Sequence, residues 1–102
     1  MGFLTMQGLT PTITVKVPNT VDLTQAAGVY PSIKQGGRII RPQIFDVDEH
    51  QVDVYLTQED TLSLVMGPAE IQLNWVFATG QRAATRPNRF NVLSNHILEV
   101  LP

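Results

Sequence analysis

Residues 70–78 read EIQLNWVFA and alternate apolar with polar side chains. Because successive side chains of a β-strand point to opposite faces, this period of two predicts a strand with one buried and one exposed face. The chain's only tryptophan, Trp75, falls on the apolar face between Leu73 and Phe77. Residues 79–82 read TGQR, a glycine-containing turn, and a second extended segment follows. The pattern therefore predicts a long β-hairpin at the centre of a small all-β domain.

The same alternation recurs in short segments separated by turn residues. Pro31 inside one of them predicts an edge strand or a bulge, because proline cannot donate to a ladder. We expect residues 44–47 to prolong the strand that precedes them, and residues 22–28 to form a capped turn or one helical turn closed by Gly28. The other predicted strands cover residues 12–17, 29–34, 38–41, 51–57 and 89–93.

One short helix is predicted near residues 58–65. Thr57 can accept a hydrogen bond from a free backbone N–H, and Glu59 and Asp60 suit the positive end of a helix. Gly-Pro at 67–68 ends it. Many short strands with one short helix predict a small all-β sandwich with an immunoglobulin-like layout. A small barrel is the alternative.

A chain of 102 residues has room for one domain. We interpret residues 1–10 as an N-terminal arm and residues 11–102 as a single β-sandwich domain. The tail over residues 95–102 is rich in large apolar side chains, which are costly to leave in water. We expect it to be the last strand of its own sheet; docking on a neighbouring subunit is the alternative. The arm is the better candidate for an intersubunit contact.

Composition excludes several classes of protein. The chain has no cysteine, so neither a disulfide scaffold nor a thiolate metal site can form. A net charge of −2 gives no electrostatic reason to expect nucleic acid or membrane as a partner. No apolar run approaches about 18 residues, and the first residues lack the features of a signal peptide. We therefore expect no nucleic-acid and no membrane partner, and synthesis in the cytoplasm.

The residues do not predict catalysis. His50 and His96 lie in a turn and in the tail, and no Gly-x-Ser-x-Gly elbow is present. The acidic run from Asp46 to Asp53 includes His50 and has the ligand types for a hard cation, but its spacing does not match an EF-hand. A solvated turn is the simpler interpretation. We expect no enzyme activity, no catalytic or metal site, no cofactor and no small-molecule substrate.

Charge is distributed unevenly along the chain. If acidic and basic stretches form opposite poles, copies of the protein could dock head to tail. The alternative is pairing across strands within one molecule, worth about 0.2–1 kcal/mol a pair. Six of the nine acidic residues lie in one stretch, namely Asp46, Asp48, Glu49, Asp53, Glu59 and Asp60. The candidate interface residues are Arg38, Arg41, Arg82, Arg86, Arg89, Asp46, Asp48, Glu49, Phe3, Leu4, Leu98 and Leu101.

Four stretches carry a resemblance to a known group. Residues 22–24 read DLT, residues 52–62 follow V-x-V-x-LTQEDTL, residues 71–75 read IQLNW and residues 80–85 follow G-x-R-x-A-T. Together these stretches resemble small proteins encoded in the virion-structural gene clusters of tailed bacteriophages and prophages, especially those of Gram-positive hosts. The turn carries Thr79-Gly80 where Asp-Gly is common in that group, and the arm and tail lie outside the resemblance.

The resemblance implies a non-enzymatic virion component with a β-sandwich fold. Its expected place is the tail tip, the baseplate or the fibre-attachment region, and its expected partners are other virion proteins and copies of itself. Two alternatives remain open. One is a carbohydrate-binding module that recognises a host cell-wall glycan, for which Tyr30, Tyr55 and Phe45 are the candidate exposed aromatics. The other is a capsid decoration protein.

Overall fold

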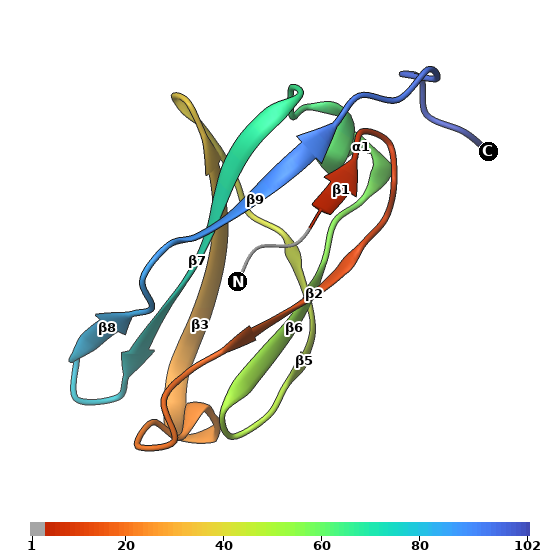
Figure 1. Cartoon of the computed structure of the whole chain (residues 1–102). Helices are drawn as coiled ribbons and strands as arrows, with labels where there is room; N and C mark the ends of the chain where they lie inside the picture. Colours follow the sequence, from red (N-terminus) through yellow and green to blue (C-terminus); the bar gives the residue numbers. More distant parts are fainter. Residues whose placement is uncertain (1–3) are drawn as a thin grey trace.

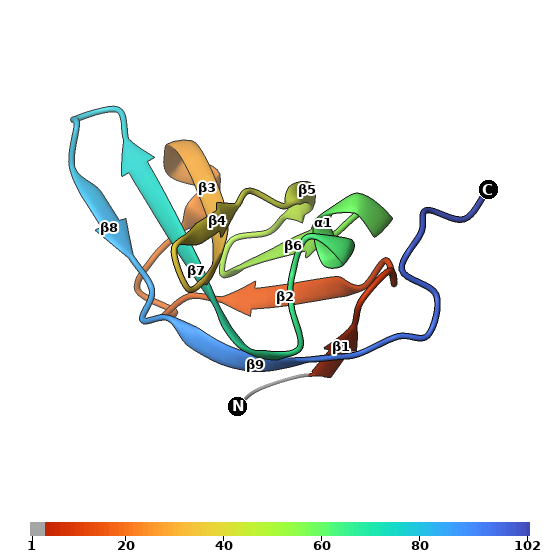
Figure 2. The same ribbon diagram turned by 90° about the horizontal axis from the view of Figure 1, so that it is seen from above.

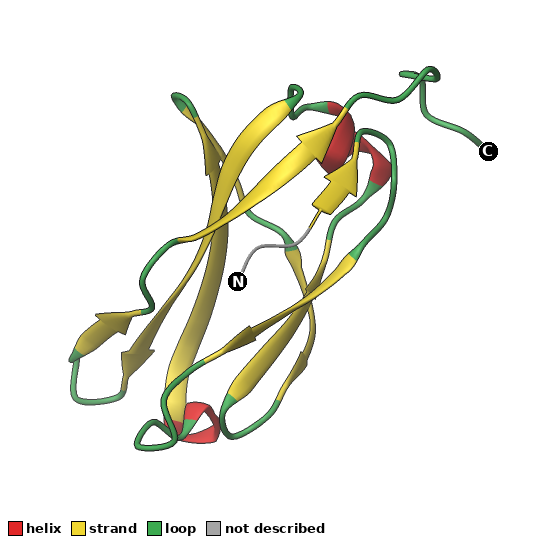
Figure 3. Cartoon of the chain, viewed as in Figure 1, coloured by secondary structure: helices red, strands yellow, loops and turns green. Residues whose placement is uncertain are grey.

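The computed structural model describes residues 4–102, and most of its regular structure consists of strands in two sheets (Figures 1 and 3). Its all-β sandwich confirms the predicted fold class, while the immunoglobulin-like layout stays a prediction. In the larger sheet the order is β1 (Leu4–Met6), β9 (Asn88–Leu93), β7 (Gly67–Phe77), β3 (Ala26–Gln35) and β4 (Arg38–Ile40), with β8 (Arg82–Ala84) also on β7. In the smaller sheet it is β2 (Thr12–Lys16), β6 (Gln51–Tyr55) and β5 (Gln43–Val47).

The predicted central hairpin is present as β7 and β8. Trp75 faces the interior with 3% of its surface exposed and lies between Val29 on β3 and Ala83 on β8. The turn places Gly80 at φ +89°, a left-handed conformation that glycine adopts without steric cost. Because β7 pairs with β3, β8 and β9, it is the strand around which the larger sheet is built.

The core fills the space between the two sheets. Each core strand contributes alternate side chains, as the period of two predicts. Trp75 Nε1 is buried without a hydrogen-bond partner in the part of the chain described. The buried apolar residues are Ile13, Val15, Val17, Leu23, Ile33, Val52, Val54, Leu56, Leu64, Ala69, Ile71, Leu73, Trp75, Phe90 and Val92.

The turn predicted over residues 22–28 ends earlier in the structure. A 3-10 helix, η1, covers Leu23–Gln25, and the Asp22 side chain caps it. β3 begins directly afterwards, so Gly28 lies inside a strand, next to a bulge, and does not close the helical turn. Pro31 pairs with Leu73 of β7, but β4 reaches only residues 33–35 on the other side. At Pro31, β3 is therefore locally an edge, as the proline predicts.

The prediction that residues 44–47 prolong the preceding strand is wrong. β4 ends at Ile40, and the chain crosses at Arg41 and Pro42 to the other sheet, where β5 pairs with β6. A bulge between Ile44 and Asp46 interrupts this pairing. All five residues of β5 are exposed, whereas β2, the other edge strand of this sheet, buries alternate residues.

The single α-helix of the described chain, α1, covers Gln58–Leu62 and confirms the short helix predicted there. Thr57 and Asp60 form a capping box: Thr57 Oγ1 accepts from the Asp60 N–H, and the Asp60 carboxylate accepts from the Thr57 N–H, both at 3.1 Å. Thr61 and Leu64 are buried beneath the helix. The Val65 side chain is exposed, but its backbone N–H and C=O bond the side chain of Gln35 at the end of β3, both at 2.8 Å.

The two chain ends differ from expectation. Within the predicted arm, Leu4–Met6 form β1, which runs parallel to β9 at the edge of the larger sheet. The prediction that the tail is the last strand of its own sheet is wrong, because no strand follows β9 in the described chain. The tail runs beyond the two sheets at the end of the molecule where α1 lies (Figures 1 and 2). Its contact with the body includes Gln58, whose side chain bonds the Leu101 backbone N–H and C=O.

Candidate functional site

The outer face of the larger sheet has a hollow of about 370 Å³ between β4 and β8. Its floor comes from β3 and β7, because Tyr30 and Asn74 are paired neighbours whose side chains point away from the core. Basic groups enter it from both sides, Arg41 after β4 and Arg82 from β8. The lining residues that characterise it are Tyr30, Ile39, Arg41, Asn74, Val76 and Arg82. The hollow thus combines apolar side chains with an amide and two basic groups, and its lining in the described chain contains no carboxylate.

Gly28 fixes the position of the aromatic ring in this hollow. A Cβ atom at residue 28 would overlap the Tyr30 ring, lying 2.7 Å from Cζ and 2.9 Å from Cε2. Because residues two apart in a strand share a face, only a glycine lets the ring lie flat over the strand here. The glycine that sequence reasoning assigned to a helix end therefore shapes the hollow.

The arginines lack acidic partners inside the molecule. In residues 4–102 no arginine or lysine nitrogen lies within 4.0 Å of a carboxylate oxygen. Arg82 donates instead to the Asn74 side-chain oxygen, at 3.4 Å from Nε and 3.2 Å from Nη2. The described part of the chain therefore does not have the ion pairs across strands that were the alternative to docking between copies. The basic side chains are left for solvent or for a partner.

The outer face of the smaller sheet carries acidic groups. Asp53 points outward between buried Val52 and Val54, and Asp46 lies directly opposite it on β5. Like charges in this position repel each other. Asp53 accepts a 2.6 Å hydrogen bond from Thr14 Oγ1, which does not neutralise it. The adjacent Phe45 stands on the bulge of β5 with 72% of its surface exposed.

The structure spreads the remaining candidates over the molecule. Arg89 lies opposite Glu70 on the outer face of the larger sheet, and Arg38 lies in the β3–β4 hairpin. Arg86 lines a separate hollow of about 450 Å³ beside Trp75 and Lys16. Acidic and basic residues thus do not form two compact poles. The clearest contrast is between Arg41 and Arg82 in the hollow of the larger sheet and Asp46 and Asp53 on the outer face of the smaller one.

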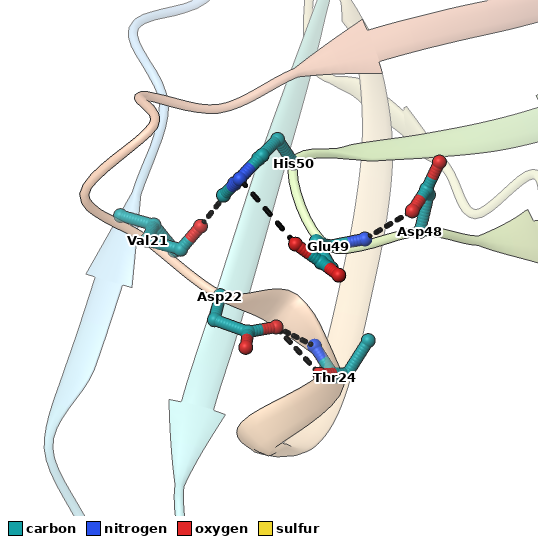
Figure 4. A network of polar contacts seen from close by, with 6 residues as sticks. All are labelled: Val21, Asp22, Thr24, Asp48, Glu49 and His50. Carbon is teal, nitrogen blue, oxygen red and sulfur yellow. Dashed lines mark hydrogen bonds and ion pairs between the residues drawn. The ribbon is translucent and has the colours of Figure 1, made fainter.

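The turn candidates Asp48 and Glu49 belong to a structural network at the η1 end (Figure 4). His50 Nδ1 lies 2.7 Å from the Val21 carbonyl oxygen, and its Nε2 lies 3.7 Å from Glu49 Oε2. The Asp48 carboxylate accepts from the Glu49 N–H at 2.6 Å. His50 therefore connects the β5–β6 turn to the segment before η1.

Asp22 caps η1 in the same network (Figure 4). Its Oδ1 accepts from Thr24 Oγ1 at 2.5 Å and from the Thr24 N–H at 3.0 Å. These two hydrogen bonds, the hydroxyl's first, lower the pKa of Asp22 below its ordinary value of 3.8, and the nearby His50 acts in the same direction. The arrangement holds the helical turn η1 in place.

No group of three or more His, Asp or Glu side chains in the described residues is arranged to hold a metal ion. The acidic run from Asp46 to Asp53 is divided between an outward-facing strand pair and the turn. His96 lies in the exposed tail.

The terminal candidates are only partly described. Phe3 lies outside the described residues, and Leu4 is placed by its backbone, opposite Asn91 on β9. In the tail Leu98 and Leu101 are exposed. From the sequence, Tyr30 and Phe45 were candidates only for binding sugar. The sequence did not show that Tyr30 lies in a hollow with two arginines, or that Phe45 projects beside Asp46. The one feature of the sequence that indicated a break between β4 and β5 is Pro42, which lies between them.

Comparison of the chain with protein-family models, curated proteins and solved structures finds no match. Among the described residues no helix has the length and apolar character needed to cross a membrane.

Proposed function

We propose that the chain is a non-enzymatic structural component of a bacteriophage virion, in the tail tip, baseplate or fibre-attachment region, and that it acts through protein–protein assembly. The observation that carries the assembly role is the set of charged and apolar side chains left without partners inside the molecule. No arginine or lysine of residues 4–102 pairs with a carboxylate. Phe45, Met66 and Leu98 are each more than half exposed.

These side chains suit assembly because they include arginines, carboxylates and apolar groups, which can pair with one another across an interface. Exposed aromatic and arginine side chains are the types enriched at the centres of protein interfaces. Basic and acidic groups on different faces favour defined orientations between partners. The virion location rests on the resemblance of residues 22–85 to phage structural proteins.

The test is to co-express the chain with the products of its neighbouring genes and measure the mass of the purified complexes. We expect rings or defined complexes that dissociate as salt is raised, because exposed charges are screened. Immunogold labelling of particles from the source strain then gives the position in the virion. A stable monomer that joins no neighbouring product and is absent from particles contradicts the proposal.

A carbohydrate-binding module is the second candidate, and the Tyr30 hollow favours it, since an aromatic ring beside amide and guanidinium groups suits a sugar. Against it, the exposed aromatics do not share a face: Tyr30 lies on the larger sheet, and Tyr55 on the smaller one. Binding to a glycan array, lost in Tyr30→Ala and kept in Tyr55→Ala, would favour this second candidate. A capsid decoration protein is distinguished from a tail component by immunogold labelling, which would then mark the capsid and not the tail.

A further inference from the structure

Phe45 and Asp46 form a projection that the fold leaves uncovered. Phe45 is the most exposed large apolar side chain of the described residues. It lies on the bulge of edge strand β5, next to Asp46, which faces Asp53 without a cation nearby. Proteins commonly protect edge strands with charges and bulges. Here the bulge presents a phenylalanine to solvent, although burying its ring would be favourable.

The hollow on the larger sheet has the opposite chemistry. Tyr30, Ile39 and Val76 offer apolar surface, and Arg41 and Arg82 offer two cations. At about 370 Å³ it falls in the range of about 300–1,000 Å³ typical of sites that enclose a small ligand. A benzyl side chain beside a carboxylate matches both of its properties.

We propose that a second copy of this chain seats Phe45 and Asp46 in this hollow. The inference rests on the proposed assembly function and names the partner and the contact. The ring is buried against Tyr30, while Asp46 gains the guanidinium groups that no residue of its own chain supplies. These cations also relieve the repulsion between Asp46 and Asp53.

The position of the two features indicates the symmetry. Tyr30 and Arg41 also line an adjoining hollow of about 400 Å³, whose far wall is Gln43 and Ile44 at the start of β5. Projection and hollow therefore lie close together at the edge where the chain crosses from β4 to β5, although Asp46 faces outward on the smaller sheet and the hollow opens on the larger one. A two-fold arrangement makes the contact twice and closes at two copies, which is the commonest symmetry of homo-oligomers.

Analytical ultracentrifugation of the full chain tests the contact. We expect a dimer whose dissociation constant rises at least about thirtyfold in Phe45→Ala, the effect of losing an aromatic hot spot. Asp46→Arg and the double variant Arg41→Glu/Arg82→Glu should each be monomeric. An equimolar mixture of these two should restore a dimer, because both contacts regain opposite charges.

Matched controls separate the contact from general surface effects. Met66→Ala removes an equally exposed apolar side chain near α1, and Arg38→Glu reverses an arginine outside the hollow. Both should dimerise as the unmodified chain does, and circular dichroism should show that every variant unfolds cooperatively.

A monomeric unmodified chain, a Phe45→Ala variant with unchanged affinity, or a mixture that stays monomeric would overturn the inference. The proposed function fails separately. If Phe45→Ala still enters complexes with neighbouring virion proteins, the assembly role stands and only the contact between copies is wrong.

Discussion

Trp75 shows how one side chain connects sheet pairing with core packing. It is 97% buried between strands that lie far apart in sequence, and its ring closes the interior next to the opening lined by Lys16 and Arg86. A side chain of this size contributes more burial than any other single residue of the core. This burial leaves the indole N–H without a hydrogen-bond partner among residues 4–102, which is unfavourable.

Trp75→Ala should therefore lower the free energy of unfolding by about 3–5 kcal/mol, through lost burial and a residual cavity. Trp75→Phe is the matched control: it keeps a ring and removes the unpartnered N–H, so its loss should be clearly smaller. Urea unfolding followed by circular dichroism measures both, since neither variant keeps the tryptophan fluorescence. Equal losses for the two substitutions would show that the ring is not what fills the site.

Asp22 makes stability depend on pH at the η1 end. Its pKa is lower in the folded chain than its ordinary value of 3.8, so the unfolded chain binds the proton more readily. The stabilisation is therefore present above about pH 3.8 and is lost as pH falls through the lower folded pKa. Asp22→Asn should remove this part of the acid sensitivity in urea unfolding curves.

The cause of that shift can be tested directly by NMR titration of the Asp22 carboxyl. Thr24→Val removes the hydroxyl donor and keeps the backbone N–H, so the pKa should rise toward 3.8. Thr24→Ser keeps the hydroxyl and should leave the pKa low. An unchanged pKa in Thr24→Val would show that the hydroxyl is not the main cause.

At the level of elements, α1 is short enough to depend on its cap. A five-residue helix forms few internal hydrogen bonds, so the reciprocal bonds between Thr57 and Asp60 satisfy a large share of its free N–H groups. The helix in turn positions Gln58, which holds the tail, and Thr61, whose hydroxyl donates to the Leu9 carbonyl at 2.7 Å.

Thr57→Ala should cost about 0.5–2 kcal/mol of folding free energy because it removes the cap acceptor. Thr57→Ser keeps the oxygen and should cost far less. Chemical denaturation of the three proteins measures the difference. Should Ala and Ser substitutions destabilise equally, the methyl group, not the cap, would be the important part of the side chain.

For whole strands, the sequence predicted most of the positions that face the core, but few of the strand pairings. Alternation identified the inward faces of β2, β6 and β7, because the pleat relates burial directly to spacing. It could not show that β4 and β5 belong to different sheets, since Ile39 and Ile44 fit the same pattern in either sheet. Pro42 interrupts the chain, but a proline does not specify where the next strand pairs.

At the scale of the whole molecule, the structure is elongated, with α1 and the tail at one end and η1 with the β5–β6 turn at the other (Figure 1). The tail contributes exposed apolar side chains to the first end, and it is hydrogen-bonded to the body through the Leu101 backbone and the Gln58 side chain. The fold therefore does not depend on the tail for its core.

Deleting residues 96–102 should change the free energy of unfolding by no more than about 1 kcal/mol, as expected for surface changes. A longer deletion that begins at Asn91 is the matched control, because it removes Val92, which is buried, and should abolish cooperative unfolding. Thermal and urea unfolding measure both. A collapse of stability in the shorter deletion would mean that the tail belongs to the core after all.

The candidate site was predictable in its residue types and not in its arrangement. The sequence identified the arginines and the acidic run as candidates, because clustered charges stand out in a chain with only 16% charged residues. That Arg41 and Arg82 share one hollow with Tyr30 depends on β4, β3, β7 and β8 lying side by side. No local pattern contains that neighbourhood.

The sequence by itself determined the secondary structure class, the inward face of each main strand, the cap of α1 and the buried place of Trp75. These follow from spacing and from hydrogen bonds between residues close along the chain. Only the tertiary structure decided which strands share a sheet, that the tail is not a strand, and which charges face outward together. Those outcomes depend on contacts between distant segments, whose energies no local window of sequence can rank.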